Sequence, residues 1–418
     1  MASAPRSAPP PPPIHIGLNA LQVRAAKSGV GQYIAGLIDG LLGLPEWQER
    51  GHRLTVFATP ENAANYQRDA ESYRVKVWGT PGARMPSRRM REWLLLPGEI
   101  RREGIDLWHG PSNFLPLWKV GRCAYVVTLH DVSYWIQPQR VTLAKRLYWK
   151  AWTARTVQVA DRFITASSHA LKTITETLRV SPGQFDLIPH APHAHFRPQP
   201  ELHAAADAWW NGGAEADAPV HPVLAEHGLR PGRYVLCVST LEPGKNLKTL
   251  VEAWAKLRRE NANNPLFDGL KLVLTGDRGW LLDPLMKAIH DSALAGDVVL
   301  TGHLPDASLP VLMNQCGVFG FLSFNEGFGL PPLEALACGA PVVASNTSSL
   351  PEVLGAAALL VPPDHIAGIV NQLFQSLMNL PLRAHLRDAG PQRAIEFSWQ
   401  KTARLTLDTY EKTCRMNR

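Results

Sequence analysis

The chain alternates short apolar runs with amphipathic segments over almost its whole length. Apolar runs such as residues 14–19 and 234–239 are typical of strands buried in a parallel sheet. Other segments repeat leucine or isoleucine at every third or fourth position, as residues 34–42 do, and this spacing predicts helices that bury one face. The alternation therefore predicts an α/β protein in which helices cover parallel sheets.

The predicted elements fall into two α/β halves. The first half covers residues 14–197 and the second covers residues 231–396. Beyond the two runs already named, we expect strands or strand ends at residues 54–57, 75–78, 106–109, 124–131, 163–169, 186–190, 271–276, 298–303, 318–322, 352–355 and 358–363. Two such halves joined by a linker imply a cleft between them.

Three segments lie outside these halves. Residues 1–13 are rich in Ala, Ser and Pro, lack the apolar core of a signal peptide, and are expected to form a disordered tail. Residues 198–230 shift to Ala, Pro, Gly and His, which predicts a linker that carries a loop insertion. Residues 397–418 are expected to form a C-terminal helix introduced by Ser398 and Trp399.

Composition and charge narrow the class of protein. A chain of 418 residues, of which 45% are hydrophobic, is long enough for two or three soluble domains with full cores. The formal charge of +7 and the pI of about 9.2 fit anionic ligands, an anionic membrane surface or nucleic acid. Nucleic acid is disfavoured, because no dense Lys/Arg run is interleaved with aromatic residues and no zinc-finger or RNP-like signature occurs.

The cysteines and the apolar runs bear on the compartment. The five cysteines are scattered without CxxC spacing, which indicates reduced core thiols of a cytosolic protein. No run approaches the roughly twenty apolar residues that span a bilayer, so any membrane contact is expected to be peripheral. The basic amphipathic stretch from Arg84 to Arg102, which contains Trp93, could rest on anionic lipid; alternatively, it is a surface helix that packs its leucines on its own domain.

The richest stretch for chemistry follows the apolar run 318–322. Gly327 and Gly329 allow the backbone to pass close to a ligand, while Pro331 suits the first turn of a helix that would end near Gly339. A helix N-terminus offers unpaired N–H groups and a positive potential. A diphosphate could therefore bind at this turn.

Two glutamates flank the expected phosphate site. Glu326 lies in the glycine loop and could face whatever lies beyond the diphosphate, while Glu334 could accept hydrogen bonds from sugar hydroxyls. The alternative for Glu334 is a simple partner of the helix dipole. The capping box that this alternative would suggest is missing, because Pro331 occupies the position of Ser or Thr.

Other turns that lead into helices offer further candidates. The turn from Gly29 to Gly31 is compatible with a phosphate, but Ile34 occupies the third glycine position of a dinucleotide-binding fingerprint, which disfavours a dehydrogenase. Lys245 stands just before a helix and could neutralise a phosphate. His130 follows a strand end, where the ligands of α/β sheets gather. Each has a structural alternative: a plain turn, a solvated lysine and a structural histidine.

Together these residues resemble a known family. The stretch from Glu326 to Glu334 resembles the two-glutamate motif of retaining glycosyltransferases of family 4. Members of that family have the GT-B fold, in which two Rossmann-like α/β/α domains face a central cleft and a C-terminal helix crosses back to the N-terminal domain. The resemblance covers nearly the whole chain, and His130, Lys245 and Gly302 recur in the expected order.

The resemblance implies a role for each candidate. Glu326 would contact the transferred sugar, and Glu334 would contact the ribose of the nucleotide. Lys245 would hold the leaving diphosphate, with His130 beside the sugar and the acceptor, so Glu326, His130 and Lys245 are the implied catalytic residues. Nucleotide-sugar contacts are implied at Gly29, Gly31, Thr240, Lys245, Gly302, His303, Leu304, Gly327, Phe328, Gly329, Leu330 and Glu334.

The sequence departs from the family in two places. An arginine often stands beside the phosphate lysine or five residues before it, but Gly244 and Thr240 occupy those positions here. Either another basic residue substitutes or the phosphate clamp is weaker. The Ile-Pro-Asn-Gly segment of relatives reads Ile-Pro-His-Ala, with His190 in place of the asparagine. The alternatives to a transferase are a non-hydrolysing nucleotide-sugar epimerase of the same fold and a nucleotide-sugar-binding protein with weakened catalysis.

The implied reaction moves a sugar from a nucleotide-diphosphate donor to a glycan or lipid-linked acceptor in surface polysaccharide synthesis, with retained anomeric configuration. No Asp-x-Asp pair is present to hold a metal-bound diphosphate, so neither a divalent ion nor another cofactor is expected. Residues 241–247 resemble those of mannosyltransferases, which favours GDP-mannose over a UDP-sugar. We expect a cytoplasmic protein, and peripheral contact of the 84–102 stretch with the inner face of the cell membrane is one of the two alternatives for that stretch.

Overall fold

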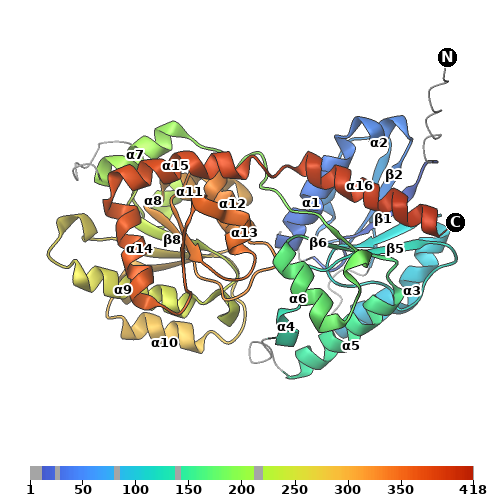
Figure 1. The fold of residues 1–418 in the computed structure, drawn as a ribbon, viewed down its shortest axis with the longest axis horizontal. Coiled ribbons are helices and arrows are strands. Elements are labelled where there is room, and N and C mark those ends of the chain that lie inside the picture. Colours follow the sequence, from blue (N-terminus) through green and yellow to red (C-terminus); the bar gives the residue numbers. More distant parts are fainter. Residues whose placement is uncertain (1–11, 24–28, 80–84, 137–142, 211–219, 418) are drawn as a thin grey trace, which may run out of the picture. The chain divides into compact units, whose positions relative to one another are not determined.

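The computed structural model describes residues 12–23, 29–79, 85–136, 143–210 and 220–417, which form two compact units (Figure 1). Unit 1 holds the chain up to residue 166, residues 171–190 and the C-terminal segment from residue 399, and unit 2 holds the rest. Each unit contains one sheet of parallel strands with helices packed on it. The predicted α/β class with two Rossmann-like halves is confirmed.

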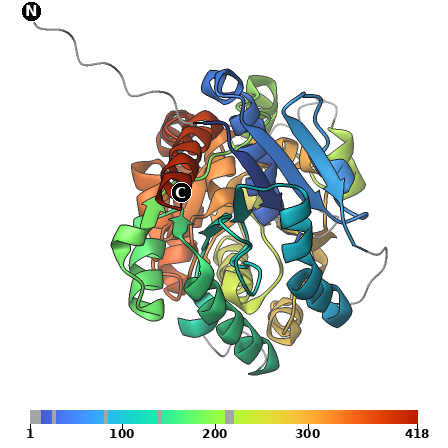
Figure 2. The same cartoon turned by 90° about the vertical axis from the view of Figure 1, so that its right-hand side faces the viewer.

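The sheet of unit 1 has the strand order β3-β2-β1-β4-β5-β6-β7, and all neighbouring strands run parallel. Its strands are β1 (His15–Asn19), β2 (Arg53–Ala58), β3 (Tyr73–Val77), β4 (Leu107–Gly110), β5 (Ala124–Thr128), β6 (Arg162–Thr165) and β7 (Phe185–Leu187). The central strands are buried along their whole length, because helices cover both faces of the sheet (Figure 2). Gly17 makes room for the Trp108 ring, since a Cβ there would lie 2.6 Å from it.

The C-terminal helix belongs to unit 1. The helices of this unit are α1 (Gly29–Leu42), α2 (Pro45–Glu49), α3 (Met85–Arg102), α4 (Ser133–Ile136), α5 (Leu143–Val159), most of α6 (Ser168–Leu178) and α16 (Trp399–Met416). Helix α16 packs on α1, where a Cβ at Gly36 would lie 2.1 Å from the Trp399 ring. The predicted return of the C-terminal helix to the N-terminal domain is therefore confirmed.

Unit 2 repeats the plan with the strand order β10-β9-β8-β11-β12-β13. Its strands are β8 (Tyr234–Val238), β9 (Lys271–Thr275), β10 (Val298–Gly302), β11 (Val318–Phe321), β12 (Val342–Ser345) and β13 (Leu359–Val361). Its helices are α7 (Pro200–Trp210), α8 (Pro222–Glu226), α9 (Leu247–Glu260), α10 (Asp283–Asp291), α11 (Leu309–Gln315), α12 (Leu330–Ala337), α13 (Leu350–Leu354), α14 (Ile366–Met378) and α15 (Leu380–Ala394). The fully buried Tyr234, Trp254 and Phe319 form part of its core.

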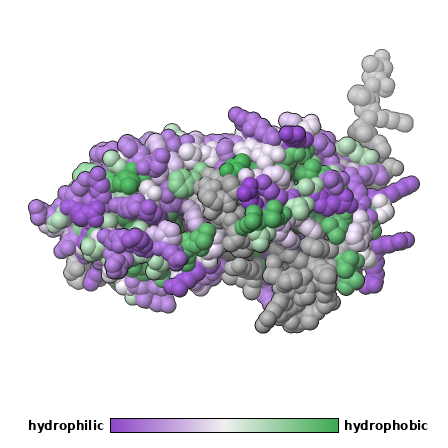
Figure 3. All heavy atoms as spheres, turned by 90° about the horizontal axis from the view of Figure 1, so that it is seen from below, coloured by the Kyte–Doolittle hydropathy of each residue, from purple (hydrophilic) through white to green (hydrophobic). Residues whose placement is uncertain are grey.

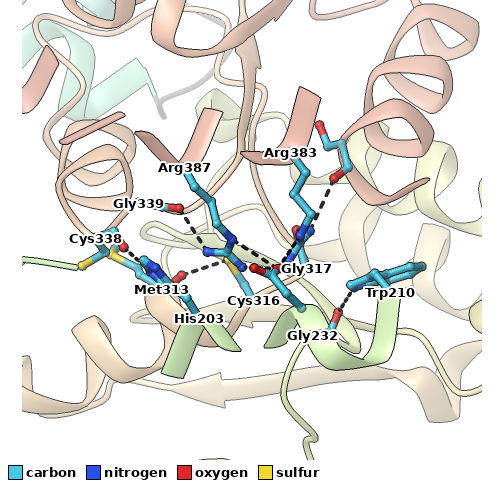
Figure 4. Close-up of polar contacts among 12 residues, drawn as sticks. His203, Trp210, Gly232, Met313, Cys316, Gly317, Cys338, Gly339, Arg383 and Arg387 are labelled. Atoms are coloured by element: carbon cyan, nitrogen blue, oxygen red, sulfur yellow. Dashed lines mark hydrogen bonds and ion pairs between the residues drawn. The ribbon is translucent and has the colours of Figure 1, made fainter. Parts of the chain in front are cut away.

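The segment expected to be a linker, residues 198–230, differs from that expectation. It carries α7 and α8 and falls within unit 2, although residues 211–219 lie outside the described part. Asp207 on α7 accepts hydrogen bonds from Arg383 at 2.6 Å and from Arg387 at 2.8 Å, and both guanidinium groups of α15 are almost fully buried. Figure 4 shows both arginines also reaching backbone carbonyls of nearby glycines. The alanines of this segment therefore lie in a helix that packs on its unit, because the ion pairs of Asp207 with Arg383 and Arg387 hold α7 against α15.

The strand predicted at residues 352–355 is wrong, because residues 352–354 belong to helix α13. The strand between β11 and β13 in the sheet is instead β12, which precedes α13 in the chain. Pro351 lies in the first turn of α13, a position that suits proline because its missing N–H would have no helical partner there. Strand β12 is buried along its whole length, as a strand between two neighbours should be. The run at residues 358–363 is confirmed as strand β13, with narrower bounds.

The basic stretch forms helix α3, but its first part is not fully described. Arg84 and the side chains of residues 85–91 and Trp93 lie outside the described set, as do residues 1–11 of the tail predicted at residues 1–13. Leu94 and Leu95 are 55% and 51% exposed. Among the described residues, no helix has the length and apolar character needed to cross a membrane. Figure 3 shows apolar patches among polar residues on the face seen from below.

Candidate active site

The topology of unit 2 marks one edge of its sheet as a ligand site. After β8 the chain adds β9 and β10 on one side and then returns to β11 on the other side of β8. In open α/β sheets, ligands bind beyond the carboxyl ends of the strands where the order reverses in this way. The loops after β8 and β11 flank this point, and they carry Lys245 and Glu326.

Lys245 is held in a tight turn between β8 and α9. The 3-10 turn Pro243–Lys245 ends at Asn246, whose φ of 55° lies in the left-handed region. The Asn246 amide donates to the carbonyl of Pro363 at 2.7 Å and accepts from the hydroxyl of Thr249 at 2.7 Å. Asparagine tolerates the left-handed region better than most residues, so Asn246 fixes the turn that presents Lys245.

The glycine loop enters α12 without a side-chain cap. Gly329 is the N-cap, with a φ of 95°, and a Cβ at this position would lie 2.5 Å from Leu350. Both restrictions require glycine here. Pro331 and Pro332 have no N–H, so the first turn offers an anion the N–H of Leu330 and the positive end of the helix dipole. The predicted helix start at these prolines is confirmed.

The fold brings Lys245 and Glu326 together. Lys245 Nζ lies 2.6 Å from Oε1 of Glu326, and the two side chains are 22% and 13% exposed. The two loops are also joined through the Gly244 carbonyl, which accepts hydrogen bonds from the Phe324 N–H at 3.2 Å and the Ser323 hydroxyl at 3.1 Å. The site therefore contains a preformed, partly buried ion pair at the point between β8 and β11 where the strand order reverses.

Two serines that the sequence did not single out shape the glycine loop. The Glu326 N–H donates to the Ser348 hydroxyl at 3.1 Å, and Ser348 has a φ of 58°, which is unusual for serine. The buried Ser349 hydroxyl lies 3.0 Å from the carbonyl oxygen of Glu326 and 2.9 Å from that of Phe328, so its single proton is shared between them. A serine pair before a leucine is a common sequence, so only the folded contact reveals its function.

Glu334 lies in α12 and is 5% exposed. Burial, and secondarily the charge of Asp306, raises the pKa of Glu334 from 4.5 to about 8. Among the described residues no hydrogen bond or ion pair reaches this carboxyl group. Helix-dipole pairing alone does not explain Glu334, because that interaction requires an ionised carboxylate, whereas burial keeps this one protonated at neutral pH.

The other predicted contacts of unit 2 lie at neighbouring strand ends. The Gly302 carbonyl, at the end of β10, accepts a hydrogen bond from the Gly276 N–H at 2.9 Å. His303 Nδ1 lies 3.9 Å from Asp277, and Leu304 follows it. These residues therefore border the loops that follow β9 and β10.

A basic residue lies beside the turn between β8 and α9, in which a phosphate-binding arginine is missing. Leu241, which follows Thr240 in the chain, forms an isolated parallel bridge with Arg278. The exposed Arg278 thus lies next to a turn that lacks its own arginine at residues 240 and 244. Sequence motifs did not indicate it, because it belongs to a different loop.

The remaining predicted residues belong to unit 1. Gly29 and Gly31 begin α1, and among the described residues, leaving aside its chain neighbours and its own helix backbone, no atom lies within 4 Å of where a Cβ on Gly29 would be. His130 follows β5, and its Nε2 lies 2.8 Å from the carbonyl oxygen of Pro111. Its Nδ1 lies 3.3 Å from Nε2 of His190. Within the described residues of either unit, no three His, Cys, Asp or Glu side chains gather in a way that could hold a metal ion.

Comparison with known families agrees with this arrangement. Residues 28–191 match the family described as Glycosyltransferase Family 4, and residues 225–393 match Glycosyl transferases group 1. The chain is 30% identical over 305 residues to O-antigen chain mannosyltransferase B of Escherichia coli, covering 73% of this chain and 74% of that protein. It is 31% identical over 184 residues to the serotype-specific mannosyltransferase WbdA of Escherichia coli, covering 44% of this chain and 22% of that much longer protein.

Solved structures share the fold. The structure of WaaG, described as a glycosyltransferase involved in lipopolysaccharide biosynthesis, superposes with a TM-score of 0.69 at 13% identity. The match covers 94% of this chain and 99% of WaaG. At this identity the likeness shows the GT-B fold and leaves the substrate open.

Proposed function

The chain belongs to family 4 of the glycosyltransferases, and we propose that it transfers mannose from GDP-mannose to a growing glycan with retention of the anomeric configuration. Membership of the family makes it a glycosyltransferase. Mannose is supported by the names of two relatives, both mannosyltransferases of Escherichia coli. One of these acts on the O-antigen chain by its name, which supports a glycan or lipid-linked glycan as acceptor.

The ion pair of Lys245 and Glu326 carries this proposal. It lies where a nucleotide sugar would bind in an open α/β sheet, between two loops that the backbone joins. An ammonium group has three N–H donors, so Lys245 can hold Glu326 and a phosphate oxygen together. Glu326 has a second carboxylate oxygen that can accept a hydrogen bond from a sugar hydroxyl.

In the proposed reaction, the bond between the anomeric carbon and the diphosphate oxygen breaks. The acceptor oxygen bonds to the same face of that carbon, and its proton passes to the departing phosphate. Lys245, the N–H of Leu330 and the dipole of α12 stabilise the negative charge that develops on the diphosphate. Because these groups neutralise the leaving group, the proposal requires no divalent ion. We assign to Arg278, whose backbone pairs with that of Leu241, the role of the arginine missing at residues 240 and 244.

The ribose is assigned to Glu334, whose carboxyl group has no partner among the described residues. Two ribose hydroxyls can donate to its two oxygens when it is ionised. This assignment also supports binding of the diphosphate at the start of the same helix.

A transferase assay with GDP-mannose and a mannan oligosaccharide tests the proposal. We expect GDP release that depends on the acceptor, survives EDTA, and yields an α-linked product by proton NMR. Glu326→Ala should abolish transfer while calorimetry still detects GDP binding, and Glu252→Ala, at a half-buried position on α9, should match the wild type. Turnover only with a UDP-sugar would refute the donor assignment, and acceptor-independent GDP release would favour the epimerase. GDP-mannose binding without turnover would favour the weakened binding protein.

We also propose peripheral contact with an anionic membrane through α3. Leu94 and Leu95 are exposed, and Arg101 and Arg102 are exposed at the end of the same helix. Sedimentation with phosphatidylserine vesicles should retain the wild type and release the Leu94→Ser/Leu95→Ser variant. Ile395→Ser, which removes an exposed isoleucine of unit 2, is the control and should sediment with the vesicles. Equal sedimentation of all three proteins would refute the contact.

A further inference from the structure

The chain passes between the units at four points, and two of them involve residues of unit 1 that contact each other. One of these passages follows His190, and the other ends at Trp399. The rings of these two residues stack, with centroids 6.5 Å apart and planes 15° apart. The hydroxyl of Thr402, in the first turn of α16, donates to the Pro189 carbonyl at 2.7 Å. These two passages are therefore fixed to one another within unit 1.

His190 is also bonded to His130. The Pro111 carbonyl, 2.8 Å from Nε2 of His130, can only accept, so Nε2 of His130 carries its proton. For a neutral ring, Nδ1 of His130 must then be an acceptor. Nε2 of His190, 3.3 Å away, is consequently the donor. The contacts form a directed chain from His190 through His130 to the Pro111 carbonyl.

The surroundings keep both rings neutral and in place. Tyr33 packs against both, with ring centroids 4.5 Å from His190 and 5.4 Å from His130. His190 is only 5% exposed. Burial lowers the pKa of both histidines, so neither ring is a cation at neutral pH.

We propose that His190 is a positioning residue that fixes the His130 ring by donating to its Nδ1, and that it links this orientation to the chain passages at residues 190 and 399. The inference rests on the proposed function and on the place beside the transferred sugar that the family resemblance implies for His130. With both ring nitrogens engaged, His130 serves as a fixed neutral surface for the sugar, while the leaving phosphate takes the acceptor proton.

Two substitutions separate the hydrogen bond from the packing. His190→Phe keeps a ring against Tyr33 and Trp399 but removes the N–H, whereas His190→Gln keeps an N–H donor in a similar place. We expect His190→Phe to lower kcat roughly tenfold, the loss typical of one hydrogen bond, with the KM for the donor changed less than twofold. His190→Gln should restore most of kcat.

Nitrogen NMR of protein labelled in histidine reports the bond directly. The Nδ1 resonance of His130 should move toward the position of an unbonded nitrogen in His190→Phe and stay near its wild-type position in His190→Gln. His52→Phe is the control, because His52 is also buried in unit 1 but contacts Ile14, Trp47 and Glu411 instead. It should leave both the resonance and kcat unchanged.

Three results would overturn the proposal: an unmoved His130 resonance in His190→Phe, wild-type kcat in that variant, or a glutamine variant no better than phenylalanine. The NMR comparison does not require turnover. If the wild type transfers no sugar, the proposed function fails, while the resonances still decide whether His190 holds His130.

Discussion

Replacing Glu334 by glutamine is expected to stabilise unit 2 at neutral pH and to remove part of its pH dependence. Glu334 is 5% exposed, and burial together with the charge of Asp306 raises its pKa from 4.5 to about 8. Glutamine has nearly the same shape but cannot ionise. The substitution therefore removes the cost of placing an ionisable group in this position.

The sign and size of the change in the free energy of unfolding follow from proton linkage. Between pH 4.5 and about pH 8 the folded protein keeps a proton that the unfolded chain has released, so the free energy of unfolding falls as pH rises through this window. A pKa difference of about 3.5, at about 1.4 kcal/mol for each pH unit, gives a loss of about 5 kcal/mol by pH 8. At pH 7 the loss is about 3 kcal/mol, which is the upper limit of the gain expected from Glu334→Gln.

Urea unfolding of both proteins between pH 5 and pH 8.5 measures this effect. Every other titrating group, including the buried histidines, is common to the two proteins and cancels in the difference. We expect the stability advantage of Glu334→Gln to grow with pH up to about 8 and then to level off. Glu252→Gln, at a half-buried position of the same unit where Lys248 pairs with the carboxylate, should give a curve parallel to the wild type. A parallel curve for Glu334→Gln would refute the reasoning, because it would mean that Glu334 is ionised in the folded protein at neutral pH.

The same group should link nucleotide binding to pH. If ribose hydroxyls donate to the Glu334 carboxylate, GDP binds the ionised form and releases a proton at pH 7. Calorimetry in two buffers of different ionisation enthalpy should then give different apparent enthalpies for the wild type and equal ones for Glu334→Gln. Equal enthalpies for both proteins would refute the ribose assignment.

Three further substitutions test the packing around the site. Asp207→Ala is expected to lower the free energy of unfolding by about 3 to 5 kcal/mol, because two buried guanidinium groups of α15 lose their carboxylate, whereas Asp291→Ala at an exposed pair should leave the urea midpoint nearly unchanged. Gly329→Ala should cost about 1 to 3 kcal/mol in the same titration, since its φ is 95° and the added Cβ would meet Leu350; a wild-type midpoint would contradict this. Ser349→Ala should cost about 1 to 3 kcal/mol and lower kcat, because two buried carbonyls of the glycine loop lose their donor, and unchanged kcat would show that the loop keeps its shape without it.

Local patterns in the sequence determined the elements around the site. Apolar runs predict buried parallel strands because both faces of each sheet are covered, and this held for β1, β8 and β11. Gly329 and the prolines after it predicted the start of α12, since their backbone preferences act within a few residues. The strand prediction at residues 352–355 was wrong because a short apolar run fits a helix as well as a strand.

Only the tertiary structure decided which residues act together. Lys245 and Glu326 lie 81 positions apart and meet because β8 and β11 are neighbours in the sheet. The hydrogen bonds of Ser349 and of His190 join segments whose spacing in the chain has no period. The raised pKa of Glu334 depends on burial by the whole unit, which no local pattern encodes. The sequence determined the kind of loop and the family, while strand order and burial determined the geometry and protonation of the site.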